Sequence, residues 1–458
     1  MIENDAFKLL LINLFHLNPD DIANIFCTTF NKMMVLIVTL ADKHQACPYC
    51  GFTAPKIKEY VTKEITHSAL TTQKCIIKYR ARRYKCSCCG KTYYEFNPFV
   101  FKSQKISILT VHNILKDLKD FNETFTSVAR RYHVSPTSVS TIFDNHVDIG
   151  RNPLPEIINF DEVYAFKSEK SKYVCVLLDF KKQIPVDVLP NRKKEYLLNY
   201  FQKIPLEERK KVKYACSDMY EVYRDVVHKV FPCSCMLLDY FHLSQDFHRK
   251  MNEVRIKVMK GYKDDKASDE YYLLKKFNWL LFKNPEDEDK YGRLFDVERE
   301  RKYNSHFKSY MNYYDLRRKL LEINNDLTIC YSLKLELVDF YSKSTIDNAQ
   351  VNLEHLICSC IDTNIEEMIA FSNNLINWKQ EIINSFTIVG TEYKVEADKG
   401  QVVVCNKKVN NAIIENRNKI IKCIKNNANG YTNWSRFRNR VMYVLDPNTT
   451  FSLEPREK

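Results

Sequence analysis

Two aspartates in the middle of the chain lie in or directly after apolar, strand-like runs, where carboxylates can bind divalent cations. Asp161 lies within Glu156–Phe166 (EIINFDEVYAF), and Asp218 directly follows Val212–Ser217 (VKYACS). Carboxylate oxygens are the ligands that Mg²⁺ and Mn²⁺ prefer. Two such ions about 4 Å apart can activate a water or a 3′-hydroxyl and stabilise the leaving oxygen of a phosphodiester. One strand-terminal aspartate is usually a turn residue, whereas two at matching strand positions favour a metal site.

The runs around these aspartates predict the elements that would position them. We expect further strands at Lys172–Asp179, at Ile184–Leu189 and at Cys233–Leu238, which ends at Asp239, and helices from about Lys193 and over Met219–Val230. The order is three strands, a helix, a strand, a helix and a strand, which is typical of a ribonuclease-H-like α/β domain. In that fold the first and fourth strands are neighbours, so Asp161 and Asp218 are expected to meet.

Two cysteine pairs near the N-terminus have the spacing of a metal site. Cys47 and Cys50 form one C-x-x-C pair, Cys86 and Cys89 form another after 35 residues, and a glycine follows each pair. Four thiolates presented in this way close a tetrahedral site for a structural Zn²⁺. The spacing leaves open whether Cys88 or Cys89 is the fourth ligand, and buried free cysteines are the alternative.

Basic and aromatic residues alternate between the two cysteine pairs. The run Lys78–Lys85 (KYRARRYK) includes Arg80, Arg82 and Arg83 and reads as a strand. Such a surface suits phosphate contacts and base stacking, although a solvated edge strand protected by charge would have the same composition.

A helical segment follows, over about 105–148. Thr124–Phe143 has the pattern of a helix, a short turn and a second helix, with Ser135 as a good N-cap and Pro136 at the first helical position. The outer face of the second helix would carry small polar side chains that suit the DNA major groove. The residues that we expect to contact DNA here are Arg130, Arg131, Thr137, Ser138 and Thr141. A helical hairpin with no role in DNA binding is the alternative.

Composition agrees with a nucleic-acid partner without requiring one. The 458 residues suggest about three domains, and 70 Lys and Arg against 57 Asp and Glu give a net charge of +13. Isolated cysteines in apolar runs and the acidic start of the chain favour a reducing cytoplasm without a leader peptide. The most apolar run, Met33–Ala41, is too short to span a membrane.

Five segments follow from these patterns. They are a zinc-binding module (1–104), a helix-turn-helix domain (105–150), the first part of a catalytic core (151–250), a charged helical insertion (251–405) and a C-terminal part of the core (406–458). The two prolines near residue 154 indicate a linker between the second and third segments.

Five stretches resemble the ISL-three group of bacterial insertion-sequence transposases. The knuckles CPYCG and CSCCGKTYYE are similar to its zinc module, and the helix-turn-helix follows in the same place. Asp161-Glu162 with YVCVLLD and DVLPNRKKE, and then Asp218-Met219 with LLDYFHL, are similar to its two catalytic blocks. Glu415–Lys425, running into NGYTN and FRNR, is similar to its C-terminal block. The resemblance extends over almost the whole chain.

The resemblance implies a carboxylate, carboxylate, glutamate triad at Asp161, Asp218 and Glu415, binding two Mg²⁺ or Mn²⁺ ions. From the residues alone, Glu415 would read as part of a solvated helix face. Lys419, Lys422 and Lys425 recur after it at three-residue steps and would contact DNA. Asp239 and His242 would have an accessory role, positioning metal, water or DNA. Ala412 and Asn416 stand where the family usually has glycines.

The implied function is a DDE-type DNA transposase that binds the inverted-repeat ends of an insertion sequence, cleaves them and transfers the freed strand to target DNA. Binding two ends suggests at least a homodimer on DNA. The expected location is the bacterial cytoplasm, at the nucleoid when bound, with no membrane partner. The alternatives are an inactive DNA-binding regulator derived from a transposase and a metal-dependent nuclease that does not join strands.

Overall fold

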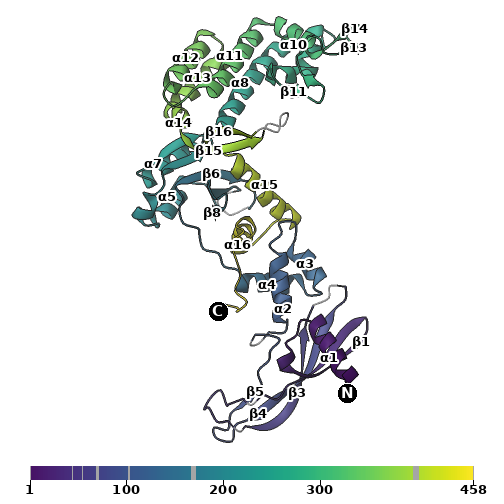
Figure 1. Ribbon diagram of the computed structural model, residues 1–458. Coiled ribbons are helices and arrows are strands. Elements are labelled where there is room, and N and C mark those ends of the chain that lie inside the picture. Colours follow the sequence, from purple (N-terminus) through teal and green to yellow (C-terminus); the bar gives the residue numbers. More distant parts are fainter. Residues whose placement is uncertain are drawn as a thin grey trace.

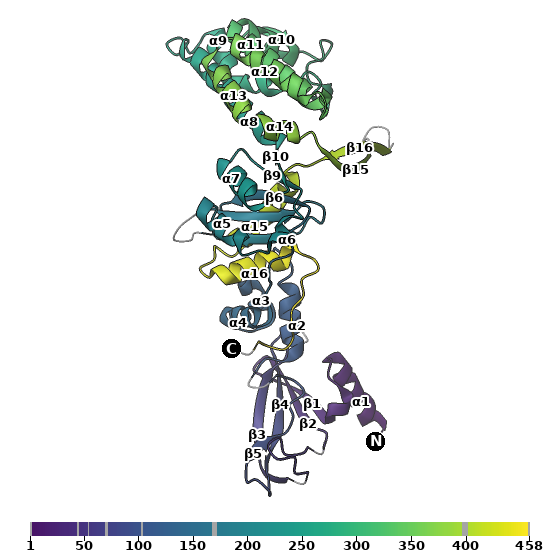
Figure 2. The same cartoon turned by 90° about the vertical axis from the view of Figure 1, so that its left-hand side faces the viewer.

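The protein is elongated, with its modules arranged one after another along the long axis (Figures 1 and 2). The computed structural model describes residues 2–43, 45–53, 55–68, 72–101, 104–166, 172–395 and 402–456. A strand-rich N-terminal module lies at one end, a helical region at the other, and a sheet with helices on both faces lies between them.

The N-terminal module is a mixed sheet with one helix. Its strands are ordered β1-β2-β4-β3, with β5 paired to β4, and β2 runs parallel to β4. The elements are α1 (Ile2–Leu14), β1 (Ile22–Phe30), β2 (Met33–Leu40), β3 (Lys56–Thr66), β4 (Cys75–Lys85) and β5 (Thr92–Tyr94). The apolar run at 33–41 is therefore a strand, as predicted. The basic strand β4 lies inside the sheet, so the edge-strand alternative is wrong.

Three helices follow: α2 (Ile108–Asp117), α3 (Phe125–Arg131) and α4 (Pro136–His146). Ser135 caps α4 by accepting a hydrogen bond from the Ser138 amide, and Pro136 occupies the first turn, as the sequence predicts. Val128, Val139 and Phe143 are buried where the helices meet. The segment therefore has its own apolar core, which fixes the angle between α3 and α4.

The central sheet has the strand order β10-β9-β6-β7-β8. Strand β6 is antiparallel to β7, β7 is antiparallel to β8, and β9 and β10 run parallel to β6. Its strands are β6 (Ile157–Val163), β7 (Val174–Asp179), β8 (Pro185–Leu189), β9 (Tyr214–Ser217) and β10 (Cys235–Leu238). All five expected strands are present, and the first and fourth are neighbours.

Helices cover both faces of this sheet. One face packs on α5 (Lys194–Gln202) and α7 (Glu221–Val230), and the short α6 (Leu206–Arg209) lies between them in sequence. The other face packs on α15 (Ala412–Asn427) and α16 (Trp434–Leu445), which come from the far C-terminal end of the chain. Two distant parts of the sequence thus complete one α/β domain (Figure 2).

The region between β10 and α15 is mainly helical and has its own apolar core. Its helices are α8 (Tyr240–Lys260), α9 (Asp269–Lys276), η2 (Asn278–Phe282), α10 (Tyr313–Glu322), α11 (Asn325–Lys343), α12 (Ala349–Asp362), α13 (Glu366–Asn377) and α14 (Lys379–Asn384). Its hairpins are β11–β12 (Glu288–Asp289, Gly292–Arg293), β13–β14 (Lys302–Asn304, Ser309–Met311) and β15–β16 (Ile388–Val395, Val402–Lys408). Helix α8 runs through residue 250, so the expected boundary there falls inside a helix.

Candidate functional site

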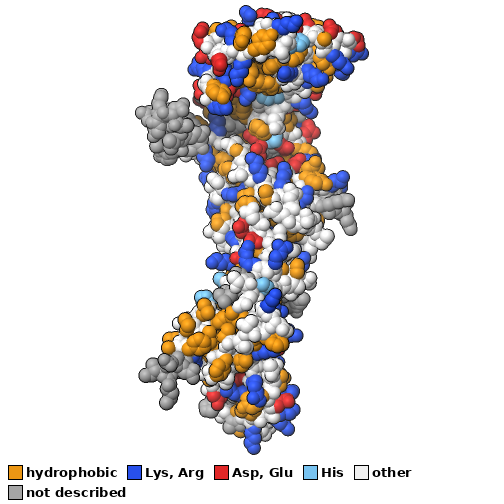
Figure 3. Space-filling model, turned by 90° about the vertical axis from the view of Figure 1, so that its right-hand side faces the viewer, with side chains coloured by type: hydrophobic (Ala, Val, Ile, Leu, Met, Phe, Trp, Pro, Cys, Tyr) orange, Lys and Arg blue, Asp and Glu red, His pale blue; other side chains and the backbone are white. Residues whose placement is uncertain are grey.

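Three aspartates form a row along one edge of the central sheet. The parallel pairing of β6 with β9 runs through Asn159 opposite Cys216, so two residues further on Asp161 comes level with Asp218. Strands β9 and β10 pair through Ser217 opposite Leu238, which brings Asp239 level with Asp218. Because the carboxyl ends of parallel strands share one sheet edge, the three carboxylates are neighbours. Figure 3 shows acidic side chains gathered there, at the waist between the helical region and the sheet.

Glu415 joins this row from a different part of the chain. It lies in the first turn of α15, which packs along β6. Its charge, like those of Asp218 and His242, acts on Asp161. Asp161, Asp218, Asp239 and Glu415 are called the carboxylate cluster below. The structure therefore brings all three members of the implied triad together.

Burial and mutual repulsion perturb the cluster. Burial, together with the charge of Asp218, raises the pKa of Asp161 to about 7. Burial also raises the pKa values of Asp218 and Asp239. Neighbouring carboxylates in a low-dielectric setting disfavour ionisation unless a cation compensates them. The cluster thus has the electrostatics of a cation site.

Asp239 and His242 lie beside Glu415. Their potential ligand atoms and that of Glu415 all lie within 4.8 Å of one another. Asp239 caps α8 through the Phe241 amide, and His242 Nε2 is 3.9 Å from Asp239 Oδ2. Among the described residues, Asp218 Oδ1 and His242 Nε2 are buried and have no hydrogen-bond partner. Both atoms are therefore available as ligands.

Three asparagines that the sequence did not single out tie α15 to the sheet. Asn418 Nδ2 donates to Asp161 Oδ2 at 2.7 Å, one turn after Glu415. Asn159 Nδ2 donates to Asn411 Oδ1 at 2.7 Å and to the Asn410 carbonyl at 2.8 Å. The Asn411 backbone amide donates to the Asp239 carboxylate. These contacts fix the start of α15, and with it Glu415, against the aspartate row.

A second cluster is formed by the cysteine pairs. The Sγ atoms of Cys47, Cys50, Cys86 and Cys89 lie within 4.8 Å of one another, with Cys47–Cys89 at 3.7 Å and Cys50–Cys86 at 3.6 Å. Tetrahedral Zn²⁺ with Zn–S bonds of about 2.3 Å requires sulfurs about 3.8 Å apart. Cys88 is exposed and lies outside the cluster. Cys89, rather than Cys88, is therefore the fourth member.

The two knuckles have the same backbone geometry. Gly51 and Gly90 have φ values of +75° and +71°, which a residue with a side chain rarely adopts. The Gly51 amide donates to the Cys47 carbonyl at 2.8 Å, and the Gly90 amide donates to the Cys86 carbonyl at 3.0 Å. The Cys89 backbone amide, which donates to Cys86 Sγ, lowers the pKa of that thiol to about 7. Thiolate formation, which metal binding requires, is thus favoured at Cys86, whereas burial and hydrogen bonds to neighbouring thiols raise the pKa of Cys50 to about 12 and also raise the pKa of Cys89.

The residues expected to contact DNA differ in their availability. Thr137 and Thr141 are exposed on α4, Ser138 is partly exposed, and Arg130 is exposed at the end of α3. Arg131 forms ion pairs with Asp117 and Glu123, so its charge is already compensated within the helical segment.

On β4 and α15, too, some of the expected DNA contacts are exposed and others are already engaged within the protein. Arg80 is exposed and stacks on Tyr60, and Arg83 pairs with Glu59 at 2.6 Å. Arg82 is paired with the buried Glu95 and donates to the carbonyls of Leu40 and Ala41, which makes it part of the module's interior. On α15, Lys419 and Lys422 are exposed, whereas Lys425 is partly buried and lies over the Tyr164 ring.

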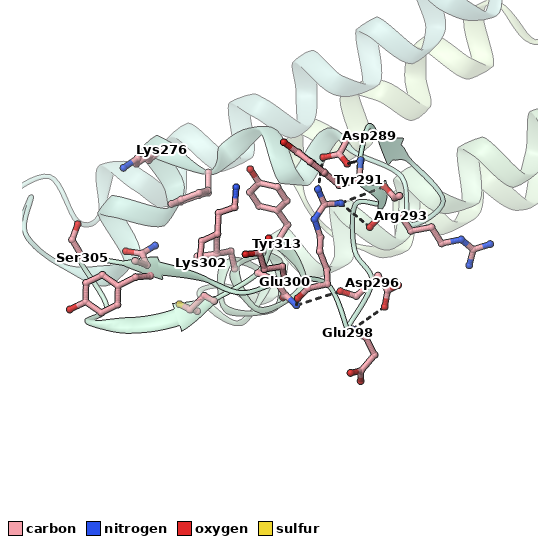
Figure 4. Close-up of a pocket in the computed structure, with 18 of the residues that line it drawn as sticks. Lys276, Asp289, Tyr291, Arg293, Asp296, Glu298, Glu300, Lys302, Ser305 and Tyr313 are labelled. Carbon is pink, nitrogen blue, oxygen red and sulfur yellow. Dashed lines mark hydrogen bonds and ion pairs between the residues drawn. The ribbon is translucent and has the colours of Figure 1, made fainter.

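A hollow of about 670 Å³ lies elsewhere, among the small hairpins of the helical region (Figure 4). Figure 4 shows acidic and basic side chains interleaved in its walls, and Arg299 donates to Asp289 there at 2.6 Å. None of its lining residues belongs to the carboxylate cluster.

No helix in the described ranges combines the length and the apolar character that crossing a bilayer requires.

Comparison with known proteins agrees with the geometry. The model of the ISL3-type DDE transposase family, the ISL-three group named above, matches residues 158–397. The chain is also 20% identical to the transposase for insertion sequence element IS1001 of Bordetella parapertussis, over 89% of this chain and 90% of that protein. Both matches support a DNA transposase and do not favour the regulator alternative. The chain therefore belongs to the ISL3 family of DDE transposases.

Proposed function

We propose that the carboxylate cluster is the catalytic centre of a ribonuclease-H-like domain, with Asp161, Asp218 and Glu415 as its metal ligands. The observation that carries the proposal is the register of β6 and β9, which makes Asp161 and Asp218 neighbours. Glu415 lies in the first turn of α15, at the end of that helix nearest to the two aspartates. The strand order β10-β9-β6-β7-β8, with β6–β8 antiparallel and β9 and β10 parallel to β6, supports the fold assignment.

The donor set fits two Mg²⁺ or Mn²⁺ ions. All three proposed ligands offer oxygen atoms, which these ions prefer. Among the described residues, Asp218 Oδ1 is buried and has no hydrogen-bond partner, so it is available to a metal ion. When bound, such ions activate the attacking hydroxyl and neutralise charge on the leaving oxygen. The protein's own contribution is positioning: Asn418 orients Asp161, and the contacts of Asn159 with Asn411 hold the start of α15. Asp239 and His242, next to Glu415, have the accessory role of orienting a ligand or water.

The N-terminal modules supply DNA recognition in this proposal. The four-cysteine cluster holds a structural Zn²⁺ that fixes the two knuckles, and α3–α4 act as a helix-turn-helix with α4 in the major groove. The exposed side chains that would contact DNA are Arg80, Arg130, Thr137, Thr141, Lys419 and Lys422.

The proposed reaction has two steps on one surface. Water attacks the phosphodiester at the element end, and the freed 3′-hydroxyl then attacks a phosphodiester of the target DNA. Because two ends must be joined, we propose a homodimer or larger assembly on DNA, acting in the bacterial cytoplasm at the nucleoid. The core is divided into 151–250 and 406–458, with the helical insertion between them.

The direct test is Mg²⁺-dependent cleavage of a DNA duplex that carries the element's own ends. Asp218→Asn is expected to abolish cleavage while leaving binding to the ends unchanged, because it removes a metal ligand and not a DNA contact. Strand transfer from pre-cut ends, measured in parallel, separates a transposase from a nuclease that cannot join strands.

Asp179→Asn is the matched control. Asp179 is a buried aspartate at the opposite edge of the same sheet, where it accepts hydrogen bonds from the Lys181 and Lys182 amides. Retention of cleavage in Asp179→Asn, with loss in Asp218→Asn, supports the proposed centre. Full cleavage by Asp218→Asn would contradict it.

A further inference from the structure

An arginine outside the carboxylate cluster is held in a fixed orientation beside it. Arg192 lies in the loop between β8 and α5, and its Nη1 donates to Glu162 Oε1. Its guanidinium carbon lies 4.8 Å from the centre of the Tyr173 ring and 4.6 Å from that of Tyr220. The positive charge of Arg192 lowers the pKa of Asp218, although burial gives that carboxyl a net increase.

Two of the residues that hold Arg192 are close to cluster residues along the chain. Glu162 follows Asp161, and Tyr220 comes two residues after Asp218. Glu162 is held in turn by the Tyr223 hydroxyl, which donates to its Oε2 at 3.2 Å. The orientation of the guanidinium is therefore set by the end of β6, the segment after β9 and the residue before β7.

Arg192 retains donors for a further partner. Its side chain is 28% exposed, and among the described residues Nε and Nη2 have no hydrogen-bond partner. A guanidinium presents these donors in a planar fork that matches the oxygens of a phosphate. A partly exposed ion pair contributes little to stability, so stability alone does not account for a cation held against two rings at this position.

We propose that Arg192 binds a non-bridging oxygen of a DNA phosphate at, or next to, the phosphodiester that is cleaved. The inference rests on the proposed catalytic centre, and it names the part of the substrate that this side chain recognises. Glu162, Tyr173 and Tyr220 are positioning residues, because they orient the guanidinium without contacting DNA. The contact is non-covalent and leaves the chemistry of the reaction unchanged.

The test uses binding of uncut end DNA, which still contains the phosphodiester to be cleaved, in Ca²⁺, so that binding is measured without cleavage. The probes are duplexes in which one phosphate at a time near the cut is replaced by an uncharged methylphosphonate. Wild type should lose affinity at one position in particular, by roughly 10- to 100-fold, the range for a hydrogen bond to a charged group. Arg192→Ala should bind unmodified DNA correspondingly less tightly and be insensitive to the substitution at that position. Arg192→Lys should recover only part of the affinity, because it keeps the charge and loses the fork.

Arg151→Ala is the control. Arg151 forms a comparable ion pair with Glu208 in the same domain, at 2.6 Å and with a side chain 29% exposed. It should keep the sensitivity of wild type at every phosphate. The proposal is overturned if Arg192→Ala shows the same methylphosphonate profile as wild type, or if Arg151→Ala reproduces its loss. Failure of the proposed catalytic centre is detected separately, as cleavage by Asp218→Asn.

Discussion

At the scale of single residues, the carboxylate cluster destabilises the fold when no cation is bound. Burial and the charge of Asp218 raise the pKa of Asp161 to about 7, whereas an unfolded aspartate titrates near 3.9. The folded chain therefore binds this proton more tightly than the unfolded chain, so the contribution of Asp161 to stability is most favourable at low pH. It falls as the pH rises from about 4 through about 7.

Asp161→Asn should consequently stabilise the metal-free protein above pH 7 by on the order of 2 kcal/mol, since it removes a charge that burial disfavours. The difference should shrink towards pH 4, where the aspartate is protonated in the folded state. Thermal unfolding in EDTA at pH 8 and pH 5 measures both. Mg²⁺ should raise the melting temperature of wild type more than that of the variant. A variant that is less stable than wild type at pH 8 would contradict this electrostatic account.

Asn418 should matter through Asp161 rather than by contacting DNA. Asn418→Ala removes the 2.7 Å hydrogen bond to Asp161 Oδ2, and loss of such outer contacts typically lowers metal affinity or activity about 10- to 100-fold. Titration of Mg²⁺ in the cleavage assay should show a raised metal requirement. Asn416→Ala, on the exposed side of the same helix, is the control and should behave like wild type. Equal metal requirements for the two variants would argue against a positioning role.

The sequence predicts some of these residues and not others, for a physical reason. Asp161 and Asp218 are recognisable because strand-like runs place them at one sheet edge. The proposed roles of Asn418 and Arg192 depend on contacts with residues far along the chain. Asparagine and arginine are common on helix surfaces and in loops, so nothing in the local sequence marks these two. Glu415 is recognisable only through the family resemblance, since a glutamate on a basic helix has no distinguishing local pattern.

At the scale of elements, the geometry of the two cysteine knuckles predicts which cysteine is the fourth zinc ligand. The spacing alone leaves that question open. Cys89→Ser should lose bound zinc and destabilise the N-terminal module, because Cys89 completes the four-sulfur cluster. Cys88→Ser should keep about one zinc per chain, since Cys88 is exposed outside the cluster. Elemental analysis of the purified proteins distinguishes them. Zinc retained in Cys89→Ser and lost in Cys88→Ser would reverse the assignment.

Elements with strong local patterns were predictable, and those defined by tertiary contacts were not. The five strands of the central sheet are buried apolar runs, and the Ser135-Pro136 start of α4 has clear capping chemistry. Helix α1 has no clear helical pattern in the sequence, because its apolar residues are spread around it and Phe7, Leu9 and Leu10 are exposed. The hairpin β15–β16 lies in a segment expected to be helical, and its pairing cannot be deduced from either strand alone.

At the scale of the whole molecule, the C-terminal helices connect the proposed catalytic centre to the proposed DNA-binding helices. Glu415 lies at the start of α15, and α16 contacts the α2–α4 unit (Figure 1). The Tyr443 hydroxyl donates to the Leu115 carbonyl at 2.9 Å, and Arg440 Nη2 donates to the carbonyls of Asp120 and Glu123, each at 2.8 Å. A segment distant in sequence thus holds the two units in a fixed relation.

Arg440 should be the main determinant of that connection. Its side chain is 1% exposed, so Arg440→Ala leaves two carbonyl acceptors without their donor and opens a cavity, at a cost of about 2–4 kcal/mol. Arg436, on the same helix, pairs with Asp144 while 28% exposed, so Arg436→Ala should cost less than about 1 kcal/mol. Hydrogen exchange should accordingly be faster in α2–α4 of Arg440→Ala than of Arg436→Ala. Because α2–α4 would then no longer be held against the central-sheet domain, cleavage of full-length ends should fall more than strand transfer from pre-cut ends. Equal exchange rates in the two variants would show that the connection does not depend on Arg440.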